Sequence, residues 1–174
     1  MSSKKKVLMV IAPKNFRDEE YFEPKNILER GNVEIKVVST TKGRAEGMLG
    51  ADVNVETTID EVDPAEYDAL VVVGGSGSQT YLWGNKRLHK MVKKAGSLGK
   101  VVAAICISPV VLARASLLSG KRATVYRTDE TISELKKAGA NVSEAPVEVD
   151  GKIVTARGPE AAKEFGRKIL EIIS

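Results

Sequence analysis

The only cysteine of this 174-residue chain is its first candidate for chemistry. Cys106 directly follows an apolar run, Val101–Ile105, which has the composition of a buried parallel strand. Ser108 and Pro109 then offer a helix start, with proline at the first helical position. This order of strand, nucleophile-type residue, sharp turn and helix is that of a nucleophile elbow. It predicts a helix N-terminus directed at the sulfur, which would favour the thiolate. The alternative is a buried core thiol, since free cysteines are among the most buried residues.

The length and composition of the chain indicate one globular domain, which we expect to span residues 1–174. Hydrophobic residues make up 43% of the chain and charged residues 29%, as is typical of globular proteins. A single cysteine excludes an internal disulfide and fits a reducing compartment. The apolar run behind the first lysines ends at Pro13, which is too short for a signal-peptide core or a membrane span. We therefore predict a cytoplasmic protein with no membrane partner.

The charges are spread along the chain rather than gathered in one tract. The net charge of +4 arises from 27 basic and 23 acidic residues that are interleaved in the sequence. Interleaved charges are typical of an ordinary solvated surface. We therefore predict no nucleic-acid partner.

Strand-like and helix-like segments alternate from one end of the chain to the other. Asp18 can cap a helix, which Pro24 should distort just after Glu20 because proline has no N–H to donate. Asp150 and Gly151 carry the signal of a type I′ hairpin turn. Expected strands span 7–11, 33–38, 69–73, 101–105 and 123–125, expected helices span 18–30, 86–98, 129–138 and 159–173, and short strands or hairpins are expected within 40–58 and 147–155. This alternation predicts a three-layer α/β sandwich with a mainly parallel sheet.

Three loops of such a sandwich are candidates for a site, because ligands of open parallel sheets bind at the carboxyl ends of the strands. The first loop, 13–20, contains Glu20, and the third carries Cys106. The second loop, 74–78, is rich in glycine, which lets the backbone approach a ligand closely. Its Gly-Gly-Ser-Gly-Ser spacing matches neither a P-loop nor a dinucleotide motif, so no nucleotide cofactor is predicted.

Four segments in this order resemble the ThiJ/PfpI superfamily, also called DJ-one/PfpI. They are Glu20 four residues before Pro24, Val71-Val72-Val73-Gly74-Gly75, Ala103-Ala104-Ile105-Cys106 and Thr155-Ala156-Arg157-Gly158-Pro159. The resemblance covers nearly the whole chain. It implies a flavodoxin-like three-layer α/β/α sandwich with a nucleophile elbow, and a homodimer or a larger homo-oligomer.

The resemblance also implies roles for individual residues. Cys106 would be the nucleophile and Glu20 its carboxyl partner. A carboxylate against a thiolate is a like-charge pair, so one of the two should keep its proton. A protonated Glu20 can donate a hydrogen bond to the sulfur or pass a proton to substrate, although a solvated acid in the first helical turn is the alternative. The backbone N–H groups of Gly75 and Ile107 would form an oxyanion hole.

The chain departs from the superfamily directly after its cysteine. In the PfpI peptidases a histidine follows the nucleophile and serves as its base, whereas this chain has Ile107. The only histidine, His89, falls within an expected helix, so a Cys–His pair is not predicted. One histidine and one cysteine also make no metal-ligand cluster, so neither a metal nor another cofactor is predicted.

Five further residues are assigned to the pocket around the cysteine. Gly74 precedes the oxyanion-hole glycine. Tyr126 stands where the superfamily often has a histidine or a tyrosine, with a half-buried structural tyrosine as the alternative. Arg17 and Arg157 could attract an anionic substrate group or could pair with surface acids. Pro159 ends the last of the four similar segments.

Three functions follow from these residues and the resemblance. The first is a glutathione-independent glyoxalase or deglycase, in which Cys106 attacks small 2-oxoaldehydes or their protein adducts and Glu20 moves protons. The second is a redox-responsive protective or chaperone-like protein whose Cys106 oxidises to a sulfinate. The third is a PfpI-type intracellular cysteine peptidase, which would need a base from elsewhere. The first of these is the function we expect.

Overall fold

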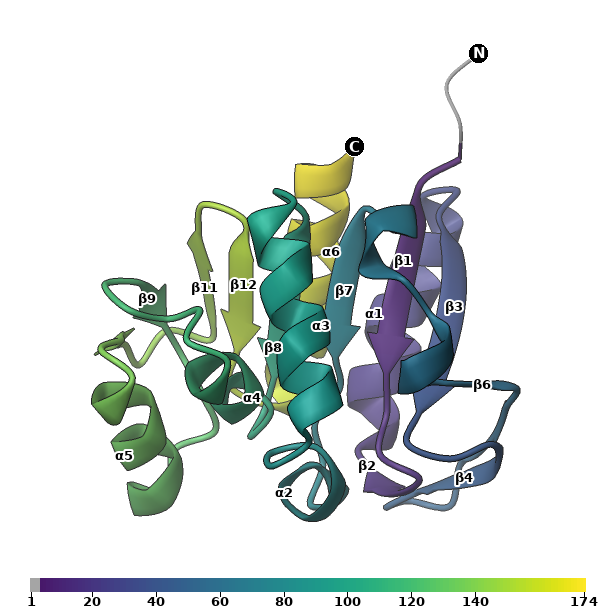
Figure 1. Ribbon diagram of the computed structural model, residues 1–174, viewed down its shortest axis with the longest axis horizontal. Helices are drawn as coiled ribbons and strands as arrows, with labels where there is room; N and C mark the ends of the chain where they lie inside the picture. Colours follow the sequence, from purple (N-terminus) through teal and green to yellow (C-terminus); the bar gives the residue numbers. More distant parts are fainter. Residues whose placement is uncertain (1–3) are drawn as a thin grey trace.

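A seven-stranded sheet runs through the centre of the computed structural model, which describes residues 4–174 (Figure 1). The strand order is β11-β12-β8-β7-β1-β3-β6, and all neighbours are parallel except β11 and β12. The strands are β1 (Lys6–Val10), β3 (Glu34–Ser39), β6 (Thr57–Thr58), β7 (Ala69–Val72), β8 (Val101–Ile105), β11 (Val147–Asp150) and β12 (Ile153–Ala156). The predicted mainly parallel sheet is confirmed.

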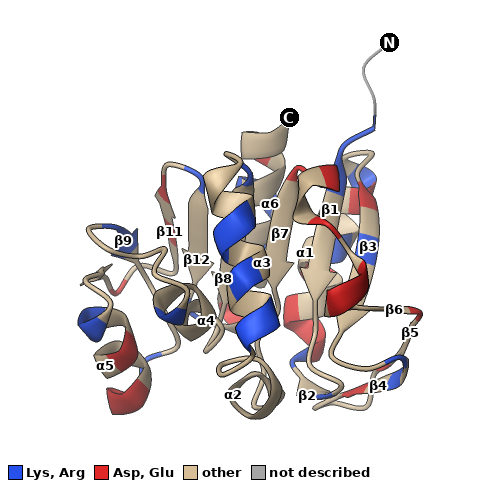
Figure 2. Ribbon diagram, in the orientation of Figure 1, with Lys and Arg blue, Asp and Glu red and all other residues tan. Residues whose placement is uncertain are grey.

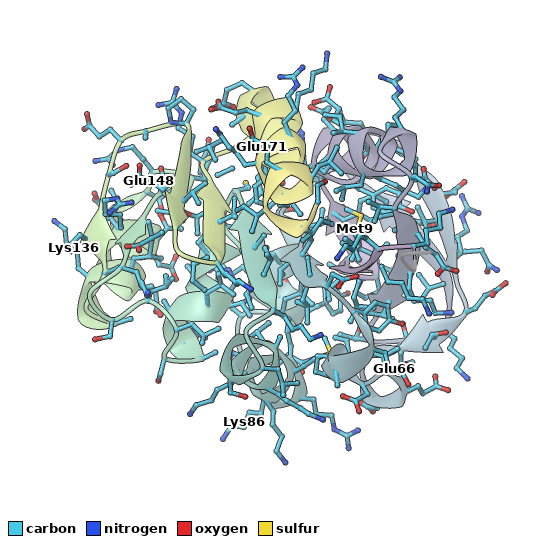
Figure 3. The ribbon with its side chains drawn as sticks, turned by 90° about the horizontal axis from the view of Figure 1, so that it is seen from above. Met9, Glu66, Lys86, Lys136, Glu148 and Glu171 are labelled. Carbon is cyan, nitrogen blue, oxygen red and sulfur yellow. The ribbon has the colours of Figure 1, made fainter. Side chains whose placement is uncertain are left out.

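Helices cover both faces of this sheet because successive strand residues point to opposite sides. Val7 and Met9 of β1 belong to the core on one side, and Leu8 and Val10 to the core on the other. The view along the strands in Figure 3 shows α1 and α6 on one side of the sheet and α3 on the other, with Met9 inside. These helices and their neighbour are α1 (Asp18–Arg30), α3 (Lys86–Ser97), α4 (Pro109–Arg114) and α6 (Ala162–Ile173). The three-layer α/β/α sandwich is confirmed.

Smaller elements gather at the edge where β1, β7 and β8 end (Figure 1). The hairpin expected within 40–58 is present, because β4 pairs antiparallel with β5. Two short strands were not predicted: β2 forms in the polar loop after β1 and pairs with β4, and β10 pairs with β9. The remaining elements are β2 (Lys14–Phe16), β4 (Gly43–Gly47), β5 (Asp52–Val55), β9 (Arg122–Ala123), β10 (Asn141–Val142), α2 (Gly77–Tyr81), α5 (Asp129–Lys137), η1 (Ile59–Glu61), η2 (Pro64–Glu66) and η3 (Pro159–Ala161).

Asp18 does not cap α1, contrary to the prediction. It is the first residue of the helix, and Arg17 takes the N-cap position without a side-chain hydrogen bond. The buried Asp18 carboxylate instead accepts hydrogen bonds from the backbone N–H groups of Leu49 at 3.1 Å and Ala51 at 3.0 Å. These donors lie in the turn between β4 and β5, so Asp18 ties that hairpin to the start of α1.

Helix α1 continues through Pro24, whose Cα lies where a side chain on Gly166 of α6 would have to fit. A distortion just after Glu20 stays a prediction. One further local prediction is wrong. The hairpin of β11 and β12 pairs Asp150 with Ile153, so its two central residues are Gly151 and Lys152 rather than Asp150 and Gly151. Only Gly151 of these two has a positive φ, whereas a type I′ turn needs positive φ at both central positions.

The charges that are interleaved in the sequence partly gather in the fold. Figure 2 shows lysines and arginines along the exposed side of α3. Two of them have acidic partners on the segment before β7: Arg87 pairs with Asp60, and Lys94 pairs with Asp63 at 2.9 Å. Within residues 4–174, no helix has both the length and the apolar character that crossing a membrane requires.

Candidate active site

Cys106 sits in a strained turn between β8 and α4. Its φ is 66°, in the left-handed region that a non-glycine residue rarely adopts. Two backbone hydrogen bonds hold this conformation: the Cys106 N–H donates to the Ala156 carbonyl at 2.9 Å, and the Cys106 carbonyl accepts from the Tyr126 N–H at 2.7 Å. Ala104 and Ser108, two residues to either side, are fully buried. Strain held in place by neighbouring elements is characteristic of functional turns.

The sulfur of Cys106 accepts two backbone hydrogen bonds. They come from the N–H groups of Gly75 and Ile107, and both lower the pKa of the thiol. Burial and the negative charge of Glu20 outweigh them and raise the pKa of Cys106 to about 12. The expectation that a helix end stabilises the thiolate is therefore wrong. Helix α4 begins only at Pro109 and is six residues long, and the N–H groups that reach the sulfur belong to loops.

Glu20 is a fully buried carboxyl group beside this thiol. Its side chain projects from the first turn of α1 with no exposed surface, and neither oxygen has an N–H or O–H partner among residues 4–174. Burial raises the pKa of Glu20 to about 8, while hydrogen bonding with Cys106 and the charge of Arg17 oppose this rise. Near neutral pH Glu20 is therefore mostly protonated, in agreement with the expectation that one partner keeps a proton.

Gly74 lets the three site loops close on one another. A Cβ at this position would overlap the Glu20 carboxyl, the Cys106 side chain and the Ile105 carbonyl. The carbonyl of Gly74 accepts a 3.0 Å hydrogen bond from the Arg17 N–H, which links the loop after β7 to the start of α1. Only glycine therefore permits this contact between the Cys106 thiol and the Glu20 carboxyl group.

Comparison with known proteins identifies the family. The model of the DJ-1/PfpI family matches residues 5–172. An uncharacterized protein of Methanocaldococcus jannaschii is 55% identical over 97% of this chain and 82% of that protein, and a deglycase of Thermococcus kodakarensis is 32% identical over 95% and 98%. A ThiJ/PfpI domain protein from Brachyspira murdochii has a crystal structure with a TM-score of 0.93, at 38% identity over 98% of both chains. The chain belongs to the DJ-1/PfpI family.

Membership of the DJ-1/PfpI family confirms the resemblance, and the structure places the other expected pocket residues unequally. Arg17 lies near Cys106 and Glu20, since its charge lowers the pKa of Glu20 and the charge of Cys106 raises the pKa of Arg17. Its guanidinium forms a 2.9 Å ion pair with the Glu19 carboxylate, which partly neutralises the charge of Arg17. Tyr126 is 49% exposed and contributes its backbone N–H rather than a buried ring.

Arg157 points away from the cysteine of this DJ-1/PfpI protein. Its guanidinium donates to the Glu144 carbonyl at 3.0 Å and to the Glu160 carboxylate at 3.1 Å, as the surface-pairing alternative anticipated. Pro159 begins the short helix η3. Glu160, which follows it, was not anticipated, yet its charge raises the pKa of Glu20.

Trp83 is a second residue that sequence reasoning missed. Its indole N–H donates a 2.9 Å hydrogen bond to the carbonyl of Ile107, the residue directly after Cys106. Its own carbonyl is bound by His89 Nε2 at 2.7 Å, so the only histidine is engaged in α3 rather than paired with Cys106. Among the described residues, no group of three or more His, Cys, Asp or Glu side chains could hold a metal ion.

Proposed function

We propose that this chain is a glutathione-independent enzyme that acts on small 2-oxoaldehydes, or on their adducts with protein amines and thiols, through Cys106. The single observation that carries the proposal is the buried Glu20 carboxyl, which has no other polar partner and lies against the thiol. Burying such a group costs free energy, so its retention argues for chemistry. The name deglycase, carried by the Thermococcus kodakarensis relative, supports the same choice.

The proposed reaction begins with attack of Cys106 on the aldehyde carbon of methylglyoxal. The C–S bond forms, the carbonyl π pair becomes an oxyanion, and the N–H groups of Gly75 and Ile107 are suited to stabilise it. Glu20 takes the thiol proton and returns it to that oxygen, giving a hemithioacetal. Glu20 then takes the proton from the former aldehyde carbon and delivers it to the oxygen of the neighbouring carbonyl group, giving an enediol. The hydroxyl group on the former aldehyde carbon next loses its proton and becomes the thioester carbonyl, while Glu20 delivers a proton to the neighbouring carbon, giving a lactoyl thioester. Water hydrolyses the thioester to lactate and the free thiol, so the net change is methylglyoxal plus water to lactic acid.

Glu20 must be ionised to accept the first proton. With a pKa of about 8, roughly a tenth of the molecules carry the carboxylate at pH 7. We therefore expect kcat/KM to rise with pH until about pH 8. Arg17 places a positive charge close enough to act on Glu20 and would favour substrates with an anionic group.

The redox and peptidase alternatives have less support. Oxidation to a sulfinate proceeds through the thiolate, and burial holds the pKa of Cys106 well above its usual value. A peptidase of the PfpI type needs a histidine base, and the His89 ring bonds to the Trp83 carbonyl instead. Both functions stay as outcomes of the experiment below.

The test is lactate formation from methylglyoxal without glutathione, measured for wild type, Cys106→Ser and Glu20→Gln. Both variants should lose turnover by a factor of at least about 100, as expected for a missing nucleophile or acid–base group. The matched control is Glu29→Gln, which removes an exposed carboxylate from the same helix and should leave turnover unchanged.

Several results would overturn the proposal. Full turnover by Cys106→Ser would exclude covalent attack by the sulfur. No turnover by wild type, with peroxide adding two oxygens to Cys106, would favour the redox function. Cleavage of fluorogenic peptides that depends on Cys106 would favour the peptidase.

A further inference from the structure

The carbonyl of Ile107, directly after the strained turn at Cys106, has only a weak partner within the turn itself. The Ile107 N–H is one of the two donors to the Cys106 sulfur. The carbonyl of the same residue is the first backbone hydrogen-bond acceptor that follows Cys106 in the chain. Within the turn, that carbonyl receives only a long 3.4 Å contact from the Val110 N–H. A left-handed non-glycine residue persists only where its surroundings over-determine it.

Trp83 supplies the missing contact from outside the turn. Its indole N–H lies 2.9 Å from the Ile107 carbonyl, and its side chain is 3% exposed. Two other residues restrict the movement of Trp83. The His89 ring binds the Trp83 carbonyl at 2.7 Å, and the Arg114 guanidinium lies 5.4 Å from the indole centre. Arg114 is itself held by Glu134 of α5 at 3.0 Å, so the indole has little freedom to turn away.

We propose that Trp83 is a positioning residue for the nucleophile: by holding the Ile107 carbonyl, its indole N–H keeps the Ile107 N–H directed at the sulfur of Cys106. This inference rests on the proposed function only in taking Cys106 as the reacting group. Trp83 touches neither the thiol nor the carboxyl group, so it acts through the backbone of Ile107. The charged groups around the sulfur, Glu20 and Arg17, are unchanged when the indole N–H is removed.

The thiol offers a direct readout that is independent of any substrate. Because Cys106 is the only cysteine, each alkylation by iodoacetamide reports its reactivity. We would measure the alkylation rate from pH 6 to pH 11 for wild type and Trp83→Phe, which keeps an aromatic ring without the N–H. One hydrogen bond fewer at the turn should lower the rate at pH 8 about three- to tenfold and move the rising limb up by about half to one pH unit.

A matched control separates positioning from loose packing. Leu88→Val removes one methylene from the same buried cluster on α3, without a hydrogen bond to the turn. It should leave the alkylation profile at its wild-type position. The proposal fails when Trp83→Phe reacts like wild type, or when Leu88→Val changes the profile as much as Trp83→Phe does.

A second variant covers the case in which Trp83→Phe does not fold. Trp83 is the only tryptophan of the chain, so growth on benzothienylalanine replaces this one N–H by sulfur and preserves the ring shape. The same upward shift is expected, and an unchanged profile overturns the proposal. Lactate formation by wild type is measured separately, so a failed proposed function does not affect this result.

Discussion

Glu20 makes stability fall as pH rises, which is the reverse of the acids whose pKa is lowered by folding. Its pKa is about 8 in the folded chain, against a usual value of 4.5. Between these values the unfolded chain loses its proton while the folded chain keeps it, so the folded state binds more protons. The stabilisation is complete below pH 4.5 and is lost as pH rises through 8. Acids with a lowered pKa have the opposite effect: their contribution to stability is lost as pH falls, and this happens below the pH range in which Glu20 acts. These acids are Glu19, Glu61, Asp63, Glu134 and Asp150.

Glu20→Gln should therefore remove a pH dependence of folding. For wild type, the free energy of unfolding should fall by up to about 1.4 kcal/mol per pH unit between pH 5 and pH 8. Glu20→Gln should be flatter over this range and more stable than wild type at pH 9. Urea denaturation at each pH measures both quantities. A wild-type slope retained in Glu20→Gln, but removed in the exposed-acid variant Glu29→Gln, would contradict the assignment.

The sequence singles out the two candidate residues in different ways. A lone cysteine between an apolar run and Ser-Pro marks the elbow, whereas Glu20 is assigned through the resemblance to the superfamily, which includes its spacing to Pro24. The structure brings Cys106, Glu20 and the two N–H donors together. The Trp83 contact joins residues 24 positions apart, and no periodicity or motif connects them.

Gly74 shows how one position in the loop after β7 sets the distance between two elements. A methyl group there would meet the carboxyl of α1 and the cysteine that follows β8. Gly74→Ala should cost about 1–3 kcal/mol of stability by overpacking and should lower turnover by separating Cys106 from Glu20. Gly84→Ala is the control, since a Cβ there meets nothing within 4 Å; it should change stability by less than about 0.5 kcal/mol. Thermal unfolding and lactate formation measure the two effects, and equal losses in both variants would contradict the packing argument.

Hydrophobic periodicity predicts the long helices and the buried strands. It does not predict features that depend on contacts with residues far away in the chain. β2 is three residues long and exists through its pairing with β4. Asp18 has the chemistry of a helix cap, yet the N–H groups of Leu49 and Ala51 compete for its carboxylate. Both features depend on the hairpin of β4 and β5 lying against α1, which the local sequence does not specify.

The whole molecule has a polar side and an apolar corner. The basic residues gather on α3 (Figure 2), and the absence of a nucleic-acid partner stays a prediction. Three of the five exposed large hydrophobic residues among positions 4–174 lie instead at the start of α1 and in the turn after β4: Phe22, Met48 and Leu49, which are 39%, 41% and 63% exposed. Asp18 ties that turn to α1, one helical turn before Phe22.

This apolar corner is where we expect two copies of the chain to meet. Burying it would remove apolar surface from water, which is the main driving force of association.

Light scattering should give wild type a mass of at least twice 18.7 kDa. Leu49→Glu should shift this mass toward that of the monomer, because the buried charge would have no partner there. Leu98→Glu is the control: Leu98 is 48% exposed and follows α3 at the opposite end of the strands (Figure 1). The Met48 sulfur accepts a hydrogen bond from the Ser76 N–H, directly after Gly75, so the corner adjoins the loop that carries one N–H donor to the Cys106 sulfur. Dissociation by Leu49→Glu should therefore also lower turnover. A monomeric wild type would contradict the predicted association, and dissociation by Leu98→Glu alone would place the contact elsewhere.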